Sequence, residues 1–157
     1  MGTSGDVRIV GFEEKYAGDF ARLNYEWIER YFEVEEHDRE MLDAPFEYVI
    51  RPGGQILFAL AGENVVGTVA LLAADDETFE LAKMAVSPDF QGRGISNKLM
   101  QGCINHARAA GKKRIFLDSN TKLTPAIRLY RKYGFREVPL SADSPYSRVN
   151  IRMELAI

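Results

Sequence analysis

The sequence has little cysteine and histidine and no long apolar run. Among 157 residues there are one cysteine and two histidines. A single cysteine cannot form an internal disulfide, which fits a reducing compartment, and we expect Cys103 to pack in the core. His37 stands among glutamates, but acidic helix surfaces are common, and we predict no metal cofactor. No segment reaches the length of a membrane span and no signal peptide is evident, so we expect a cytoplasmic protein without membrane contact.

The length suits a single domain with one core. A chain of 157 residues buries roughly 70% of its unfolded surface. The composition, 46% hydrophobic and 27% charged, is that of an ordinary globular protein. We therefore predict one domain over residues 1–157, in which residues 1–5, small and polar, are a disordered start or a remnant of expression.

A net charge of −3 conceals two segments of opposite sign. Residues 26–43 contain eight acidic residues against two arginines, whereas residues 91–132 contain ten basic residues against one aspartate. The basic half suits a polyanionic ligand. Nucleic acid would also be attracted, but no aromatic-rich stacking motif or DNA-reading helix pair accompanies the basic residues. We therefore predict no nucleic-acid partner.

The most informative segment runs from Lys83 to Met100, from an apolar strand through a proline-marked loop and two glycines into an amphipathic helix. Gly92 and Gly94 stand just before the predicted helix start, where glycine lets the backbone turn tightly. Several free N–H groups and the positive end of the helix dipole then converge on one point. Such a point binds phosphate.

Two other kinds of phosphate loop share this physics. A Walker loop ends in Gly-Lys-Ser/Thr, but here Gly94 is followed by Ile95 and Ser96, which disfavours binding of a nucleoside triphosphate. The dinucleotide fingerprint needs a third glycine where this chain has Asn97, although Asp118 ends the next strand at a suitable distance. A dinucleotide-binding oxidoreductase is therefore the weaker alternative.

The loop Gln91-Gly92-Arg93-Gly94-Ile95-Ser96 resembles the phosphate loop Gln/Arg-x-x-Gly-x-Gly/Ala of the GNAT acetyltransferases, which use acetyl coenzyme A. Ser96 departs from the usual residue there but is still small. A second family element, Ala-x-x-Leu-Tyr-x-Lys-x-Gly-Phe, is matched from Ala126 to Phe135. Two motifs in the family's order and spacing are stronger than either alone. Both lie in the C-terminal half, while the order of strands and helices resembles the family from Val7 onward.

Hydrophobic periodicity and turn residues predict the elements of the fold. Strands are expected at 7–10, 56–61, 65–73, 78–86, 114–119 and 149–155; helices are expected from Tyr16 to Val34, at 38–50 with a break at Pro45, at 95–110, and from Thr124 as N-cap to just before Gly134. The resemblance implies an α/β (α+β) GNAT fold. Its central sheet would be mixed, mostly antiparallel and seven-stranded, flanked by about four helices and splayed between strands four and five.

The resemblance also implies how acetyl coenzyme A would bind. Its pyrophosphate would sit on the N–H groups of the loop residues Gln91, Gly92, Arg93, Gly94, Ile95 and Ser96. Backbone groups of Met84, Ala85 and Val86 would pair with the pantetheine arm, like an added strand, and one N–H would polarise the thioester carbonyl. Asn120 follows the next strand, where family members often place an asparagine that contacts the cofactor.

Two residues are candidates for proton transfer. Tyr130 occupies the family position of the general acid that protonates the departing thiolate; an ordinary phenol, with a pKa of about 10, is protonated at neutral pH. The alternative is that Tyr130 only packs, as we expect for Tyr133. Glu80 lies where one branch of the superfamily keeps a glutamate that deprotonates the amine through water, and an exposed strand edge is the alternative. Strand alternation cannot decide, because a bulge expected from the family would reverse the faces of later residues.

We therefore expect an N-acetyltransferase that transfers an acetyl group directly to a primary amine. In the family, the segment containing residues 26–43 borders the acceptor pocket, and its acids would attract a cationic small molecule or a protein or peptide amine, unless they form a solvated helix face. The loop from Leu140 to Arg148 would supply another wall. A non-catalytic acyl-coenzyme A sensor is a further alternative. Acceptor, acyl length and oligomeric state are open, although family members are often homodimers.

Overall fold

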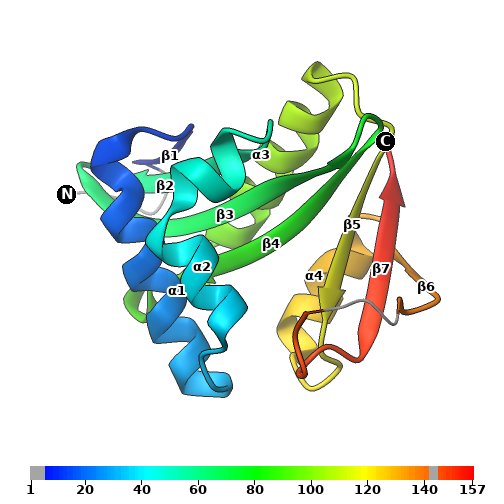
Figure 1. The fold of residues 1–157 in the computed structure, drawn as a ribbon. Helices are drawn as coiled ribbons and strands as arrows, with labels where there is room; N and C mark the ends of the chain where they lie inside the picture. The colour runs from blue at the N-terminus through cyan, green and yellow to red at the C-terminus, as the bar shows by residue number, and fades with distance from the viewer. Residues whose placement is uncertain (1–5, 142–144) are drawn as a thin grey trace.

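The computed structural model describes residues 6–141 and 145–157, so the expected state of residues 1–5 lies outside the described residues (Figure 1). The strands are β1 (Val7–Val10), β2 (Gln55–Ala61), β3 (Asn64–Asp75), β4 (Thr78–Val86), β5 (Arg114–Ser119), β6 (Arg136–Val138) and β7 (Ile151–Ala156). The longer helices are α1 (Ala17–Tyr31), α2 (Glu36–Asp43), α3 (Ile95–Ala109) and α4 (Thr124–Lys132), with short helical turns at Glu14–Tyr16, Phe46–Ile50 and Pro88–Phe90.

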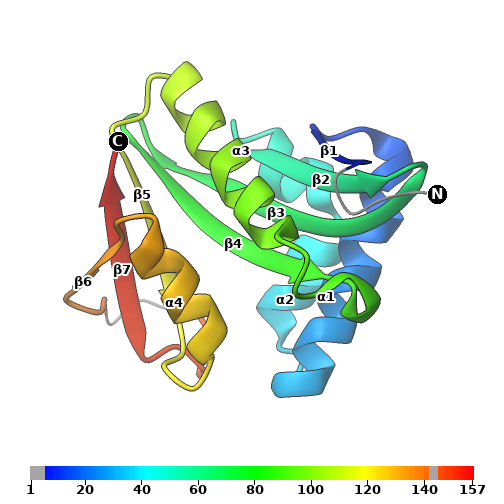
Figure 2. The same ribbon diagram turned by 180° about the vertical axis from the view of Figure 1, so that it is seen from behind.

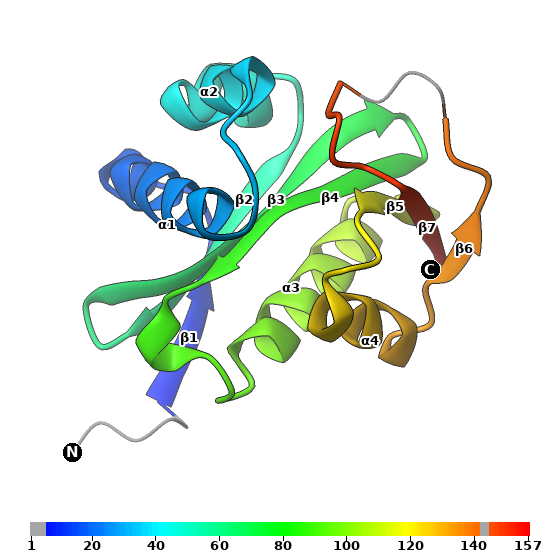
Figure 3. The same cartoon turned by 90° about the horizontal axis from the view of Figure 1, so that it is seen from below.

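The seven strands form one sheet in the order β1-β2-β3-β4-β5-β7-β6. Neighbouring strands pair antiparallel except β4 and β5, which run parallel. Figure 3 shows the layers, with α1 and α2 on one side of the sheet and α3 and α4 on the other. This arrangement confirms the predicted mixed, mostly antiparallel sheet with helices on both faces.

The sheet separates two hydrophobic cores. Beneath α3 and α4, Leu99 and Cys103 pack with strand residues such as Phe79, and Figure 2 shows α3 lying across the long strands of this face. Beneath α1 and α2, Phe20 and Leu23 pack against the opposite face. Cys103 is fully buried, as predicted, and burial raises the pKa of its thiol. The two cores fix the helices from which the site is built.

The parallel strands β4 and β5 stay together only at their beginnings. Thr78, Phe79 and Glu80 pair with Arg114, Ile115 and Phe116, and no later pair joins the two strands. Figure 1 shows β4 and β5 diverging beyond that point. The predicted splay between strands four and five is therefore present, and it leaves one edge of β4 without a partner strand.

A β-bulge interrupts β4 beside this gap. Leu81 pairs with Leu71 and Ala85 pairs with Thr68, so β4 contains one residue more than β3 over the same stretch. Lys83 lies in the bulge with a φ of 57°, a conformation that side-chain-bearing residues rarely adopt. Leu81 packs in the core beneath α3, whereas Ala85 packs in the core beneath α1. The extra residue thus reverses the faces, as the family resemblance led us to expect.

Two predicted helix boundaries were wrong by a few residues. α1 ends at Tyr31 and does not reach Val34, because Phe32 is extended, with a φ of −148°. Thr124 is the first residue of α4 instead of its N-cap, and no side chain caps that helix. Tertiary contacts of Tyr31 and Phe32, described below, accompany the early end of α1.

Candidate active site

A cleft of about 830 Å³ opens where β4 and β5 separate. One wall consists of α1 and the part of β4 from Glu80 to Val86, and the other of the end of β5, α4 and the residues around Tyr146 and Arg148. The phosphate loop follows the carboxyl end of β4 and lines the same cleft. Every predicted catalytic or cofactor-binding residue except Arg93 lines it, so the structure brings together residues that lie far apart in the chain.

Most of the phosphate loop keeps its backbone N–H groups free, although the Gln91 N–H donates to the Pro88 carbonyl at 3.4 Å. Gly92 and Gly94 have φ values of 79° and 78°, in the left-handed region that glycine tolerates. Gly94 is the N-cap of α3, and no side chain caps this helix. Among the described residues, no hydrogen bond uses the N–H groups of residues 92–97. An added Cβ at either glycine would meet no atom within 4 Å, so neighbouring side chains do not crowd these two residues.

Side chains brace this loop against β4. The Gln91 side-chain amide donates a hydrogen bond of 3.2 Å to the Val86 carbonyl. The Arg93 guanidinium lies over the Phe90 ring, 4.9 Å from its centroid. The Arg93 side chain is thus turned onto Phe90, and Arg93 is not among the residues that line the cleft.

The edge of β4 that faces β5 has no strand partner beyond Glu80. Met84, Ala85 and Val86 line the cleft along this stretch, while the opposite edge of the strand pairs with β3. A free strand edge can accept an extended ligand by main-chain hydrogen bonds. The geometry therefore fits the predicted pairing of this edge with a pantetheine arm.

Tyr130 is 8% exposed and packs against Phe135, with 5.8 Å between ring centroids. Burial raises its pKa to about 12. Its hydroxyl makes no hydrogen bond to the described residues, yet no side-chain nitrogen or oxygen among them is both fully buried and unpaired. The hydroxyl therefore reaches the cleft that Tyr130 lines. Tyr133, in contrast, bonds to the Asn97 side chain at 3.1 Å, in keeping with the packing role predicted for it.

Glu80 points to the α1 side of the sheet, because its neighbours Phe79 and Leu81 both pack beneath α3. It lines the cleft where β4 and β5 part. Burial, and next the negative charge of Asp118, raise the pKa of Glu80 to about 7, while Arg152 and Lys83 act in the opposite direction. A carboxyl group with this pKa is half ionised at neutral pH and can both take and release a proton.

Asn120 lines the cleft, but part of its side-chain amide is hydrogen-bonded to the protein backbone near the end of β5. Its amide nitrogen donates to the Arg148 carbonyl at 2.7 Å, and its oxygen accepts from the Lys122 N–H at 2.9 Å. These bonds hold the chain at the end of β5 against the segment before β7. Contact with the cofactor, which needs the remaining N–H or the lone pair, stays a prediction.

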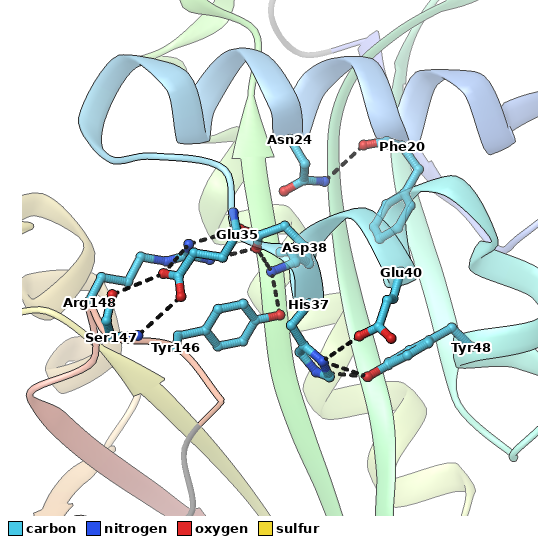
Figure 4. A network of polar contacts seen from close by, with 11 residues as sticks. Phe20, Asn24, Glu35, His37, Asp38, Glu40, Tyr48, Tyr146, Ser147 and Arg148 are labelled. Carbon is cyan, nitrogen blue, oxygen red and sulfur yellow. Dashed lines mark hydrogen bonds and ion pairs between the residues drawn. The ribbon is translucent and has the colours of Figure 1, made fainter.

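The structure contains a buried polar group that the sequence analysis did not predict. We call it the Asp38 cluster, and its members are Asp38, Lys83, Arg148, Tyr146 and Glu35. Asp38 accepts hydrogen bonds of 2.7 and 2.9 Å from Arg148 and of 2.6 Å from Lys83. Lys83 also donates to the Tyr146 hydroxyl at 3.0 Å, and Arg148 contacts Glu35 at 3.3 Å. Figure 4 shows Arg148 and Tyr146 reaching α2 from the far side of the cleft. The cluster therefore joins the two halves of the molecule across the splay.

The charged groups of this cluster shift one another's pKa values. Burial alone would raise the pKa of Asp38, but hydrogen bonds from Arg148 and Lys83 outweigh it and hold that pKa well below its usual range. Burial lowers the pKa of Lys83, and the bond to Asp38 only partly offsets this effect. Burial, followed by the charge of Asp38, raises the pKa of the Tyr146 phenol. The cluster is thus an ionised aspartate held between two cations.

A second bridge crosses the same side of the cleft. The Lys122 ammonium, from the loop after β5, lies 4.3 Å from the centroid of the Phe32 ring and donates to the Tyr31 carbonyl at 3.4 Å. This carbonyl belongs to the last residue of α1, where a cation is favoured by the helix dipole. Together with the Asp38 cluster, this contact joins the two walls of the cleft.

The acidic segment 26–43, for which an acidic wall and a solvated helix face were both open, contributes no acid to the lining of the cleft. Glu40 and Asp43 bind neighbouring side chains on the surface, and the Asp38 cluster takes two more acids. Within residues 6–141 and 145–157, the acids that line the cleft are Glu80 and Asp118. The same described residues contain no set of three potential ligands that could hold a metal ion and no helix long and apolar enough to cross a membrane.

Comparison with known proteins identifies similar sequences. Residues 21–135 match the model of the family described as the acetyltransferase (GNAT) family. Human N-acetyltransferase 8B is 29% identical over 115 residues, which are 70% of this chain and 51% of that protein. Human N-acetylaspartate synthetase is 32% identical over 130 residues, which are 82% of this chain and 42% of that protein. The chain thus spans about half the length, or less, of these curated relatives.

Solved structures share the fold over nearly the whole chain. An acetyltransferase of the GNAT family from Staphylococcus aureus Mu50 superposes with a TM-score of 0.85 at 21% identity, covering 96% of this chain and 98% of that one. An acetyltransferase from Streptococcus agalactiae 2603 gives 0.83 at 26% identity, covering 97% and 99%. The PaiA N-acetyltransferase from Thermoplasma acidophilum, solved in complex with coenzyme A, gives 0.76 at 16% identity, covering 96% and 99%.

Proposed function

The chain belongs to the GNAT acetyltransferase family, and we propose that it is an N-acetyltransferase that transfers an acetyl group from acetyl coenzyme A directly to a primary amine. One observation carries the proposal. A phosphate loop with free N–H groups at the start of α3 opens onto the same cleft as the unpaired edge of β4 and the Tyr130 hydroxyl. Such a combination suits a long anionic thioester whose reactive end lies deep in the protein.

The residues present fit the donor along its length. The unbonded N–H groups of residues 92–96 would receive the pyrophosphate, helped by the dipole of α3, whereas the Gln91 N–H is bonded to the Pro88 carbonyl. The edge at Met84, Ala85 and Val86 would pair with the pantetheine amides, and one N–H of this edge would polarise the thioester carbonyl. The spare N–H of Asn120, which lines the opposite wall, would contact the donor.

Glu80 is the proposed base. An alkyl ammonium with a pKa of about 10.4 is almost entirely protonated at neutral pH, and it must lose a proton before its nitrogen can attack. A carboxylate with a pKa of about 7 is a stronger base than an ordinary glutamate and still ionises at neutral pH. It would take this proton directly or through a water molecule.

Tyr130 is the proposed acid. As the new C–N bond forms and the C–S bond breaks, the electron pair of that bond leaves with the sulfur. The phenol, kept protonated by a pKa of about 12, would donate to this sulfur, which takes up the proton. The nitrogen gives up two protons in all: Glu80 would take the first before attack and release it to water, and would take the second as the C–N bond forms. Tyr130 would recover its proton from solvent, so protons and electron pairs balance without a covalent enzyme intermediate.

The proposed acceptor is a cationic small molecule or a protein or peptide amine. The support for a cation comes from Glu80 inside the cleft, not from the surface acids of residues 26–43; Asp118 also lines the cleft, but its carboxylate accepts two hydrogen bonds from Arg152. The relatives include an N-acetylaspartate synthetase and a PaiA N-acetyltransferase, whose names indicate N-acetylation.

The dinucleotide alternative is wrong, because family and fold both place the chain elsewhere: this sheet contains a single parallel pair, whereas a dinucleotide fold is mostly parallel.

Thiol release from acetyl coenzyme A, measured across polyamines, amino acids, aminoglycosides and lysine peptides, tests the proposal. We expect amine-dependent release that falls at least about a hundredfold in Tyr130→Phe. Tyr133→Phe is the matched control, since its hydroxyl bonds to Asn97 on the protein, and it should keep parental rates. Equal rates in all three proteins would refute the role of Tyr130 but not the transferase. Coenzyme A binding without turnover on any amine would replace the transferase by an acyl-coenzyme A sensor.

A further inference from the structure

Asn24 is the one buried polar residue of α1, and half of its side-chain amide has no partner. The residue is 1% exposed, and its amide nitrogen donates to the Phe20 carbonyl at 2.9 Å. Because a carbonyl can only accept, this bond fixes which end of the amide is nitrogen. The Asn24 Oδ1 atom makes no hydrogen bond to the described residues.

The free oxygen is directed into the cleft. Asn24 lines the cleft together with Trp27 and Ile28, the next residues on the same face of α1. No side-chain oxygen among the described residues is both fully buried and unpaired, so the small exposed part of Asn24 includes Oδ1. Figure 4 shows this oxygen turned away from the Phe20 carbonyl. An asparagine in a helix interior costs stability, and its oxygen faces the cleft without a partner among the described residues, which points to a ligand.

The position of α1 indicates which ligand this is. The start of α3 and Tyr130 of α4, which would serve the donor, lie on one face of the sheet, and α1 lies on the other (Figure 3). Glu80 also points to the α1 face. Asn24 therefore lies on the same face of the sheet as the proposed base, where an acceptor that gives its proton to Glu80 would bind.

We propose that the Asn24 Oδ1 atom accepts a hydrogen bond from the attacking nitrogen and thereby selects primary over secondary amines; this inference rests on the proposed function. An amide oxygen is too weak a base to take the proton, so it orients the nitrogen without competing with Glu80. As the C–N bond forms, the nitrogen becomes positively charged and its N–H groups become stronger donors. The bond is then stronger in the transition state than in the ground state.

The number of N–H groups on the attacking nitrogen explains why a primary amine would react faster than a secondary one. A primary ammonium that has lost one proton to Glu80, which releases it to water, keeps two N–H groups, so during attack one can pass its proton to Glu80 while the other stays bonded to Asn24. A secondary amine at the same stage keeps a single N–H group, which cannot serve both residues. The secondary amine therefore leaves either the base or the buried amide oxygen unsatisfied, which slows its reaction.

The test uses Asn24→Leu, which keeps the size of the side chain and removes the amide. The probes are the best amine of the panel and its N-methyl derivative; for a lysine peptide these are the lysine and the Nζ-monomethyl-lysine forms. We expect kcat/KM for the primary amine to fall about ten- to a hundredfold, because a hydrogen bond to a charged group is lost, and the primary-to-secondary ratio to fall with it. The KM for acetyl coenzyme A and the affinity for coenzyme A should not change.

Thr68→Val is the matched control, since Thr68 is a buried polar residue whose hydroxyl is paired with the Leu57 carbonyl at 2.9 Å. It should lose thermal stability and keep the selectivity, whereas Asn24→Leu should lose selectivity without losing stability. Parental selectivity in Asn24→Leu, or a weaker affinity for coenzyme A, would overturn the inference and leave the transferase intact. A parent protein that acetylates no amine would refute the proposed function and the inference with it.

Discussion

Replacing Asp38 by asparagine tests how firmly the Asp38 cluster joins the two halves of the molecule. The Asp38 side chain has no exposed surface. It accepts two hydrogen bonds from Arg148, one from Lys83 and one from the Glu35 backbone N–H. Asparagine has the same shape but no charge, and its amide nitrogen cannot accept a hydrogen bond. The variant therefore leaves two cations facing each other in the protein interior.

The size of the effect follows from burial. The Lys83 side chain is 6% exposed and that of Arg148 is 15% exposed, so water cannot replace the lost carboxylate. Removing one partner of a buried ion pair typically costs about 3 to 5 kcal/mol. For a chain of this length each kcal/mol lowers the melting temperature by about 2 to 4 °C, which predicts a fall of about 6 to 20 °C.

Thermal and urea unfolding followed by circular dichroism would measure this loss. Glu47→Gln is the control, because it removes an exposed ion pair with Arg51 and should cost less than about 1 kcal/mol. The stabilisation should also depend on pH with a definite sign. Since the folded pKa of Asp38 is depressed, its contribution is complete above about pH 4 and is lost as the pH falls below that value. An Asp38→Asn protein within about 1 kcal/mol of the parent would refute the reasoning.

Three further predictions concern single residues. Glu80→Gln should abolish the rise in kcat/KM that the parent shows as the pH increases through about 7. Because the raised pKa of Glu80 destabilises the fold at high pH, the variant should also be the more stable protein at pH 8. An unchanged pH profile would exclude Glu80 as the base. Gly94→Ala should weaken coenzyme A binding and cost about 1 to 2 kcal/mol of stability, because φ is 78° at this position. Gly18→Ala, inside α1 with open space around it, should instead stabilise the protein. Calorimetric titration measures the binding, and thermal unfolding measures the stability. Cys103 should not react with a thiol reagent until the protein unfolds, since it is fully buried, and a fast reaction in the native state would contradict that burial.

The sequence predicted the elements that frame the cleft because local signals mark their ends. The bounds Thr78–Val86 for β4 and Arg114–Ser119 for β5 agree with the structure, since acidic turns, a proline and a glycine flank these apolar runs. The end of α1 was wrong for a tertiary reason. Periodicity continues to Val34, but Phe32 leaves the helix where Lys122, from the opposite wall, binds the last carbonyl and the aromatic ring.

The Asp38 cluster could not have been predicted from the sequence. Asp38 and Arg148 are far apart in the chain, and an aspartate on an acidic helix looks like one of many solvated acids. Only the fold shows that Asp38 is the buried one. The role of Asn24 was hidden in the same way, because a polar residue on an apolar helix face has no local signature for the direction of its free oxygen.

The bulge in β4 connects these features. A side chain at a φ of 57° costs about 1 to 3 kcal/mol, and Lys83 keeps this conformation because its ammonium is bound by Asp38 and Tyr146 on the α2 side. The same extra residue reverses the faces of β4, so that Ala85 packs beneath α1 while Leu81 packs beneath α3. A buried ion pair between α2 and β4 thus stabilises a strained backbone immediately before the edge proposed to hold the thioester. Strain of this kind persists only where the surrounding contacts impose it, which argues that the Asp38 cluster positions the donor edge as well as joining the two walls.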